Sequence, residues 1–251
     1  MNKSVSILGL GWLGMPLAQE FYSKGFEVLG SRRAEVEDLL FKTFVVDLSE
    51  ISEVEASFFE VDTFIIALPS KDLEGYQNLI ARLKGSLSLK QVVLMSTTSV
   101  YASLNTTVDE DSELNDSVRV DIESLFKQAF PERLCVLRLG GLIGYSRQPG
   151  NFFQGGRSIP QPDGYVNLVH RDDVIQSTLK LVEASAIGCY NIVARAHPGR
   201  GVFYHNQQEK LGNAPSPLQR EDVLKYKIVS SERIRSEFDV VFRYDDLIEF
   251  P

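Results

Sequence analysis

The 251-residue chain has little cysteine, no block of basic residues and no long hydrophobic run. Its two cysteines, Cys135 and Cys189, lie in apolar segments without a Cys-x-x-Cys pair or a Cys/His cluster, so we expect buried, reduced thiols and no metal site. The apolar run near the N-terminus is short and broken by glycines, unlike a signal peptide, and no stretch reaches membrane-spanning length. The sequence therefore predicts a cytoplasmic protein without a membrane partner.

Positive charge is also scarce. Lys and Arg number 26 against 34 Asp and Glu, which gives a formal net charge of -8. Because nucleic acids are bound largely through clustered Lys and Arg, this balance argues against a nucleic-acid partner. An anionic cofactor remains compatible with it, since a helix N-terminus and one or two arginines make a site locally positive.

The first half of the chain alternates short apolar, β-rich runs with segments of helical spacing. The runs predict strands at Val5–Leu8, Phe26–Leu29, Thr43–Val46, Thr63–Ala67 and Gln91–Met95. The spacing predicts helices at Met15–Ser23, Ala34–Phe41, Val54–Phe59 and Leu73–Leu87. Such alternation implies right-handed crossovers and a parallel sheet covered by helices on both faces.

The second half has a looser pattern. It predicts a helix at Val118–Phe130, strands at Leu134–Leu139, Val166–Val169 and Cys189–Val193, and a helix at Asp173–Ala184. The predicted fold is an α/β, Rossmann-like, doubly wound parallel sheet. We expect a cofactor-binding core over residues 1–139 and a small C-terminal substrate-binding region over 140–251, partly returning to the core sheet.

A glycine-rich turn gives the strongest single motif. It follows an apolar strand and opens a helix, the setting in which a G-x-G-x-x-G pattern indicates a dinucleotide site. The first glycine permits the tight turn, the second allows close approach of a pyrophosphate, and the third lets helix and strand pack closely. We therefore expect the cofactor to contact Gly9, Leu10, Gly11, Trp12, Leu13 and Gly14.

The end of the second strand indicates which dinucleotide is bound. An NAD site places a carboxylate there for the ribose 2′-hydroxyl, but this chain has Ser31, Arg32 and Arg33. Arginine binds a phosphate with a fork of hydrogen bonds, whereas a carboxylate would repel it. NADP is therefore favoured over NAD, the alternative being that both arginines are solvent-exposed residues at a helix start.

Further cofactor contacts are expected at the carboxyl ends of the next strands, where open α/β sheets bind their ligands. Asp47 is a candidate for the adenine amino group, with Leu48 packing on the ring, although an aspartate there also suits a helix N-cap. The other expected contacts are Ala67, Leu68, Pro69 and Ser96.

The stretch Ser96–Tyr101 resembles the Ser-Ser-x-x-Val-Tyr-Gly segment of the extended short-chain dehydrogenase/reductases, which include NAD-dependent epimerases and dehydratases. The resemblance covers nearly the whole chain. It is carried also by Gly11–Gly14, Val108–Asp111, Val136–Gly140 and Asn167–Val174. The direct G-x-G-x-x-G and the stretch His197–Arg200 look like the atypical YeeZ-like bacterial branch.

The resemblance implies that Thr97 hydrogen-bonds the substrate oxygen during hydride transfer. The family's proton relay, a Tyr-x-x-x-Lys pair, is missing, because none of the nine tyrosines has a lysine four positions later. If the helix at Val118–Phe130 matches the family helix, Asn115 stands at the Tyr position and Arg119 at the Lys position. We expect Arg119 to hold a ribose or stabilise negative charge, since its guanidinium does not deprotonate near neutrality.

Either another residue supplies the proton, with Tyr101, Tyr145 and the acids of Asp109–Glu113 as candidates, or the protein binds its cofactor without turnover. The loop after the sixth strand is expected to contact a small-molecule substrate through Tyr145, Arg147 and Asn151. The first hypothesis is an NADP- or NAD-dependent oxidoreductase or epimerase/dehydratase-like enzyme acting on a small carbonyl, hydroxyl or sugar-nucleotide substrate. The second is a non-catalytic NADP-binding sensor. His170 is interpreted as structural, with Asp172 or Asp173 capping the next helix.

Overall fold

The computed structural model describes residues 3–34 and 39–247. A seven-stranded sheet runs in the order β11-β7-β5-β4-β1-β2-β3, and its pairs β1–β2, β2–β3, β1–β4 and β4–β5 are parallel. The strands are β1 Ser4–Leu8, β2 Glu27–Arg32, β3 Lys42–Val45, β4 Thr63–Ile66, β5 Gln91–Thr97, β7 Leu134–Leu139 and β11 Gly188–Ile192. The chain order reverses between β1 and β4, as in a Rossmann fold, which confirms the predicted class.

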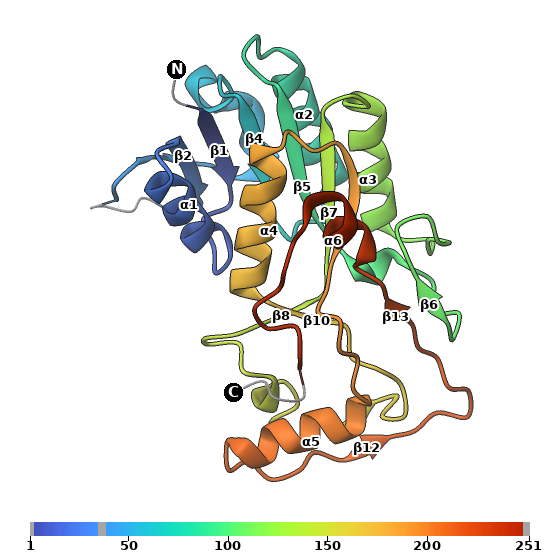
Figure 1. The fold of residues 1–251 in the computed structure, drawn as a ribbon. Coiled ribbons are helices and arrows are strands. Elements are labelled where there is room, and N and C mark those ends of the chain that lie inside the picture. The colour runs from blue at the N-terminus through green and yellow to red at the C-terminus, as the bar shows by residue number, and fades with distance from the viewer. Residues whose placement is uncertain (1–2, 35–38, 248–251) are drawn as a thin grey trace. The chain divides into compact units, whose positions relative to one another are not determined.

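Four helices cover this sheet: α1 Gly14–Ser23, α2 Leu73–Lys84, α3 Val118–Ala129 and α4 Arg171–Glu183. Figure 1 shows α2 and α3 side by side, and it shows α1 and α4 in front of the sheet. The amide of Gln176 in α4 donates to the Glu20 carboxylate of α1 at 3.2 Å, so these two helices are neighbours. Both faces of the sheet are therefore covered, as the strand-helix alternation predicted.

Helix α2 illustrates how sequence sets these elements. The Asp72 carboxylate accepts a hydrogen bond from the Gly75 N–H at 3.0 Å and caps the helix start. Tyr76, Leu79 and Leu83 recur at helical spacing and are buried, and the Tyr76 ring meets the Phe126 ring of α3 edge-on at 5.8 Å between centroids. Burial of each such side chain stabilises the fold by about 1.5–3 kcal/mol.

Contacts along the chain divide it into two compact units. The first consists of Met1–Ser96, Asp116–Leu137 and Ile175–Cys189, and the second of Thr97–Asn115, Arg138–Val174 and Tyr190–Pro251.

The second unit is built from short parallel pairs and two helices. β8 Gly141–Ile143 pairs with β10 Leu168–His170, β9 Ile159–Pro160 with β12 Leu218–Gln219, and β6 Thr107–Val108 with β13 Ile228–Val229. The helices are α5 Arg200–Lys210 and α6 Glu232–Phe238, and the 3₁₀ turns are η3 Thr98–Val100 and η4 Pro149–Asn151. One apolar cluster of this unit gathers Ile143, Ile159, Val166, Leu168, Ala194, Phe203, Tyr204 and Leu247.

One predicted helix differs from the structure, and another lies partly outside the described residues. The segment Val54–Phe59 is not an α-helix: η1 Leu48–Glu53 precedes it, and η2 Ala56–Phe58 is a single 3₁₀ turn. The tight turn lets the consecutive rings of Phe58 and Phe59 both pack on Phe64, at 5.3 and 5.8 Å between centroids. Half of the helix predicted at Ala34–Phe41, residues 35–38, lies outside the described residues, and residues 39–41 are not helical.

Candidate functional site

The glycine turn leaves β1 and enters α1 through two positions that tolerate only glycine. Gly9 has a φ of +106°, and a Cβ there would lie 2.7 Å from the Leu68 side chain. A Cβ on Gly14 would lie 2.0 Å from the carbonyl oxygen of Gly9, far inside contact distance. The start of α1 is therefore held directly against the end of β1.

The same turn fits a phosphate group. A Cβ on Gly11 would meet no heavy atom within 4 Å, so the backbone there is open to a ligand. The N-cap residue of α1, Leu13, makes no side-chain cap hydrogen bond, and the first turn of the helix contains no acidic residue. Because the first N–H groups of a helix lack intrahelical acceptors and carry the positive end of its dipole, this terminus attracts an anion.

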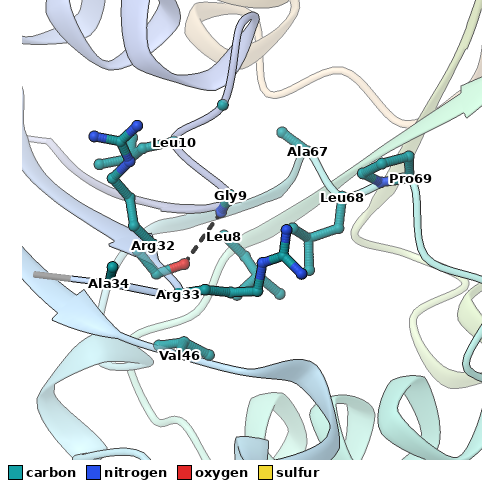
Figure 2. Close-up of a pocket in the computed structure, with 12 residues that line it drawn as sticks. Leu8, Gly9, Leu10, Arg32, Arg33, Ala34, Val46, Ala67, Leu68 and Pro69 are labelled. Carbon is teal, nitrogen blue, oxygen red and sulfur yellow. Dashed lines mark hydrogen bonds between the residues drawn. The ribbon is translucent and has the colours of Figure 1, made fainter.

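A cavity of about 520 Å³ opens beside the turn (Figure 2). Its wall comes from the carboxyl ends of β1, β2 and β4 and from the residue after β3, the crevice in which this sheet type binds ligands. The lining residues are Leu8, Gly9, Leu10, Gly11, Ser31, Arg32, Arg33, Ala34, Val46, Ala67, Leu68 and Pro69.

Most of the predicted cofactor contacts meet in this wall, and three of its residues were not predicted. Leu8, Ala34 and Val46 were missed, although Leu8 ends β1 and Val46 directly follows β3. For Leu8 and Val46, the position at a strand end is the signal that identifies them, whereas Ala34 lies two residues beyond β2. Of the predicted contacts, Trp12, Leu13, Gly14, Asp47, Leu48 and Ser96 are not in this wall.

Ser31 and the two arginines differ in their surroundings. The Ser31 hydroxyl is 1% exposed and accepts a hydrogen bond from the Gly9 N–H at 3.1 Å, while the Ser31 carbonyl accepts one from Leu10. Ser31 thus fixes the glycine turn to β2. Arg32 and Arg33 are exposed at the cavity, and Figure 2 shows their side chains extending in different directions. No carboxylate stands among the described residues of the wall.

The residues after β3 have structural surroundings. Asp47 is the N-cap of η1, because its carboxylate accepts hydrogen bonds from the Ser49 N–H at 3.0 Å and the Ser49 hydroxyl at 2.8 Å. These bonds, and the nearby charge of Arg33, hold the Asp47 pKa below its ordinary value. Leu48 is 7% exposed and belongs to the apolar core of the first unit. A contact of either residue with adenine stays a prediction.

Arg119 and Ser96 also lie in the first unit. The Arg119 guanidinium donates to the carbonyl oxygens of Pro69 and Ser70 at 2.6 and 2.7 Å, so it holds the loop that follows β4. The Ser96 hydroxyl donates to the buried Glu123 carboxylate at 2.6 Å, and the Lys127 ammonium reaches the other oxygen of that carboxylate at 3.2 Å. Helix α3 is thereby fastened to the ends of β4 and β5.

In the second unit, Thr97 begins the segment expected to meet the substrate. Its hydroxyl oxygen accepts a hydrogen bond from the Ser99 N–H at 3.2 Å and caps η3. Tyr101 is 1% exposed, and its phenol donates to Asn191 at 2.6 Å and accepts from Arg138 at 2.9 Å. A proton-donor role for Tyr101 stays a prediction, and its phenol lies in a buried hydrogen-bond network.

Asn115 stands where the family pattern has its tyrosine. Its side-chain N–H donates to the carbonyl oxygens of Ser99 at 2.6 Å and Tyr101 at 3.4 Å. Its own carbonyl oxygen is buried and has no hydrogen-bond partner in the described part of the chain.

The loop after β8 has an exposed tyrosine at its tip. Tyr145 has a φ of +53°, its hydroxyl donates to the Asp172 carboxylate at 3.0 Å, and its ring lies 3.8 Å from the Arg171 guanidinium. Arg147 and Asn151 are exposed, and the Asn151 side-chain oxygen accepts a hydrogen bond from Asn213 at 3.0 Å. Substrate contacts by these loop residues stay predictions.

His170 and Asp173 have structural partners. His170 is 5% exposed and stacks on Tyr244 at 3.7 Å between centroids, and burial lowers its pKa. The Asp173 carboxylate is buried and accepts hydrogen bonds from the N–H groups of Arg243 and Tyr244 at 2.7 and 3.1 Å. Asp173 therefore anchors the C-terminal segment. Neither Asp172 nor Asp173 is the helix cap that the sequence suggested, because α4 already begins at Arg171.

Two kinds of feature are absent from the described residues. No group of three or more His, Cys, Asp or Glu side chains among them is placed to hold a metal ion. None of their helices is long and apolar enough to cross a membrane.

Known proteins resemble the chain over its full length, although no family model matches it. It is 32% identical over 273 aligned residues to Protein YeeZ of Escherichia coli (strain K12), with 99% of each chain covered. A protein of Methylobacillus flagellatus named for the NAD-dependent epimerase/dehydratases superposes with a TM-score of 0.80 at 21% identity, over 98% of this chain and 95% of that one. UDP-glucuronic acid 4-epimerase of Bacillus cereus in complex with NAD gives a TM-score of 0.78 at 14% identity, over 97% and 94%. These two structures share the fold.

Proposed function

Because the chain belongs to the YeeZ-like branch of the atypical short-chain dehydrogenase/reductases, we propose that it is a nicotinamide-dinucleotide-dependent oxidoreductase or epimerase/dehydratase-like enzyme. The observation that carries the proposal is the cavity at the glycine turn, walled by strand ends and by two exposed arginines. In this proposal residues 1–139 bind the cofactor and residues 140–251 contribute the substrate region.

The turn would hold the pyrophosphate, and Arg32 and Arg33 would hold the adenosine end. When bound, the nicotinamide ring supplies or accepts a hydride. Thr97 would donate its hydroxyl proton as a hydrogen bond to the substrate oxygen and orient it. The substrate class is a small carbonyl or hydroxyl compound, or a sugar nucleotide of the kind named for the Bacillus cereus epimerase.

NADP is the favoured cofactor. Arg32 and Arg33 are exposed, with no carboxylate among the described residues of the cavity wall to bind a ribose 2′-hydroxyl. A 2′-phosphate would give either guanidinium a charge-assisted pair of hydrogen bonds, which the 2′-hydroxyl of NAD offers only weakly.

A non-catalytic NADP-binding sensor is the second candidate. The residues at the two positions of the family's Tyr-Lys proton relay, Asn115 and Arg119, favour this candidate. The side-chain N–H of Asn115 and the guanidinium of Arg119 are both bound to backbone carbonyl oxygens. Neither group releases a proton near neutrality.

A titration with NADPH, NADH, NADP and NAD tests the cofactor proposal. We expect preference for the phosphorylated forms and a loss of NADPH affinity of roughly tenfold or more in Arg32→Ala or Arg33→Ala, with NADH affinity changed little. Lys24→Ala, an exposed residue at the end of α1, is the matched control and should bind like the parent. Absence of binding by any form would refute the proposal, and equal losses for NADPH and NADH would refute the 2′-phosphate assignment.

Turnover separates the two candidate functions. NADPH oxidation is followed with a panel of small aldehydes, ketones and keto-sugar nucleotides, and Thr97→Ala serves as the inactive variant. Turnover that Thr97→Ala abolishes supports the enzyme. Tight binding without turnover supports the sensor.

A further inference from the structure

Lys227 is a half-buried lysine without an acidic partner. Its ammonium donates a hydrogen bond to the carbonyl oxygen of Tyr101 at 2.5 Å. No carboxylate of the described residues lies within ion-pair distance of it, and it immediately precedes β13. A buried lysine that lacks a counter-charge is costly to keep charged, so such a residue needs a reason in function or structure.

The surroundings of Lys227 place it at the segment of Thr97. Asn115 donates to the same Tyr101 carbonyl oxygen at 3.4 Å and to the Ser99 carbonyl oxygen at 2.6 Å. Ser99 in turn donates its N–H to the Thr97 hydroxyl oxygen at 3.2 Å. The three side chains of Thr97, Asn115 and Lys227 therefore gather around one short stretch of backbone within the second unit.

Asn115 contributes a second observation at this place. Its side-chain carbonyl oxygen is buried and has no hydrogen-bond partner among the described residues. A buried acceptor left without a donor costs free energy, so its presence in a folded protein calls for an explanation, such as a role in binding or catalysis. A hydroxyl group of a substrate is a donor of the right kind.

The electrostatic setting suits proton transfer. Burial lowers the pKa of Lys227 below that of an exposed lysine, and the nearby positive charge of Arg200 lowers it further. Arg200 is itself fixed by the carbonyl oxygens of Pro160 and Tyr165, each at 3.2 Å. A lysine with a lowered pKa releases its proton at a lower pH than an exposed lysine, which favours a role in proton transfer.

We propose that Lys227 is the proton donor and acceptor of the reaction, in place of the tyrosine that Asn115 has replaced. In the reducing direction, a bound nicotinamide would supply the hydride of the new C–H bond. The carbonyl π electrons move to oxygen, which takes a proton from the Lys227 ammonium. The neutral amine then recovers a proton from water, and oxidation follows the reverse course. This inference rests on the proposed oxidoreductase function.

The titration of Lys227 is measured on the full chain by competitive labelling with acetic anhydride across pH, with each lysine followed by peptide mass spectrometry. Lys225 is the internal reference, because it is exposed and only two residues away. We expect Lys227 to reach half-maximal reactivity at a lower pH than Lys225. A midpoint equal to or above that of Lys225 would overturn the proposal.

Variants test the role in turnover. Lys227→Met removes the amine, and Lys227→Arg keeps the charge in a group too weakly acidic to transfer its proton. Lys225→Met is the control. We expect all three to bind NADPH within about twofold of the parent. Both Lys227 variants should lose roughly 10²- to 10⁴-fold in turnover, which is the usual contribution of general acid–base catalysis. Their pH profiles of turnover should also lack the limb that the titration of Lys227 produces in the parent.

The outcomes distinguish this inference from the function on which it rests. Normal NADPH binding with an active Lys227→Arg variant would overturn the role of Lys227 alone. Normal NADPH binding without turnover in the parent would overturn the role of Lys227 and favour the non-catalytic sensor. Failure of the parent to bind any dinucleotide would overturn the proposed function and the inference together.

Discussion

Replacement of Gly14 by alanine tests how the start of α1 is packed. The new Cβ would lie 2.0 Å from the Gly9 carbonyl oxygen and 3.5 Å from a methyl group of Ile7. Because real Cβ atoms do not approach other atoms closer than about 3.0 Å, the carbonyl or the helix must move by roughly 1 Å. That displacement alters the turn that would hold the pyrophosphate.

The size of the effect follows from two opposing contributions. Overpacking of this kind costs about 1–3 kcal/mol, while alanine in place of glycine in a helix recovers up to about 1 kcal/mol. The clash therefore prevails, with a net loss of about 1–2 kcal/mol. For a chain of this size, each kcal/mol lowers the Tm by about 2–4 °C, so we expect a decrease of about 2–8 °C.

Gly11→Ala is the matched comparison in the same turn. Its Cβ would meet no protein atom within 4 Å, and Gly11 does not have a positive φ, so stability should be unchanged. Its NADPH affinity should nevertheless fall at least about tenfold, because the methyl group occupies the approach of the pyrophosphate. Thermal unfolding gives the stabilities, and the fluorescence of Trp12, the only tryptophan of the chain, reports binding at the turn.

The two substitutions, three residues apart, are therefore expected to differ in stability: Gly14→Ala should lower the Tm, whereas Gly11→Ala should leave it unchanged. If Gly14→Ala has the Tm and NADPH affinity of the parent, the close approach of α1 to β1 is not what the structure describes. If Gly11→Ala binds NADPH normally, the pyrophosphate does not lie over the turn.

Three further predictions concern the surroundings of the site. Ser31→Ala should weaken the binding of NADPH and NADH by the same factor, because the Ser31 hydroxyl accepts the hydrogen bond of the Gly9 N–H. A loss of affinity for NADPH alone would instead assign this hydroxyl to the 2′-phosphate. Arg119→Met should weaken the binding of 2′,5′-ADP as much as that of NADPH, since the Arg119 guanidinium holds the cavity loop after β4. A loss of affinity confined to NADPH would instead place Arg119 at the nicotinamide half of the cofactor. Burial lowers the pKa of His170 and His197 below the ordinary 6.5, so the unfolded chain binds protons that the folded chain does not. The free energy of unfolding should then decrease as the pH falls below about 6.5. In urea unfolding measured from pH 8 to 5, this decrease should be shallower in the double variant His170→Gln/His197→Gln than in the parent. Equal slopes in the parent and the variant would contradict the lowered pKa of these histidines.

The sequence predicted the main sheet well because its strands are continuous apolar runs. The strands predicted at Val5–Leu8 and Leu134–Leu139 agree with β1 and β7 within one residue, and the helix predicted at Val118–Phe130 agrees equally well with α3. Each of these elements is buried against its neighbours, so local hydrophobic pattern and final structure coincide. The two-residue strands of the second unit carry too few residues for a period and were not predicted.

The partners of the polar residues could not be predicted in the same way. Tyr101 looks like a candidate acid in the sequence, but its phenol is bound by Arg138 and Asn191, which lie 37 and 90 residues further along the chain. Lys227 has no motif around it, and only the fold brings it to the Tyr101 carbonyl oxygen. The chemistry of a side chain follows from its residue type and its neighbours in sequence, whereas its long-range hydrogen bonds depend on the tertiary structure.

The discontinuous division of the chain has a consequence for synthesis on the ribosome. Every residue of the cavity wall lies between residues 8 and 69 and therefore emerges early. The sheet that carries this wall is completed only when β11 has emerged from the ribosome. Two segments of the second unit, Thr97–Asn115 and Arg138–Val174, emerge before that. A nascent chain thus exposes an unpaired edge of β5 until β7 arrives, the kind of edge that invites pairing with other chains. Truncation at any single point leaves at least one of the two units incomplete.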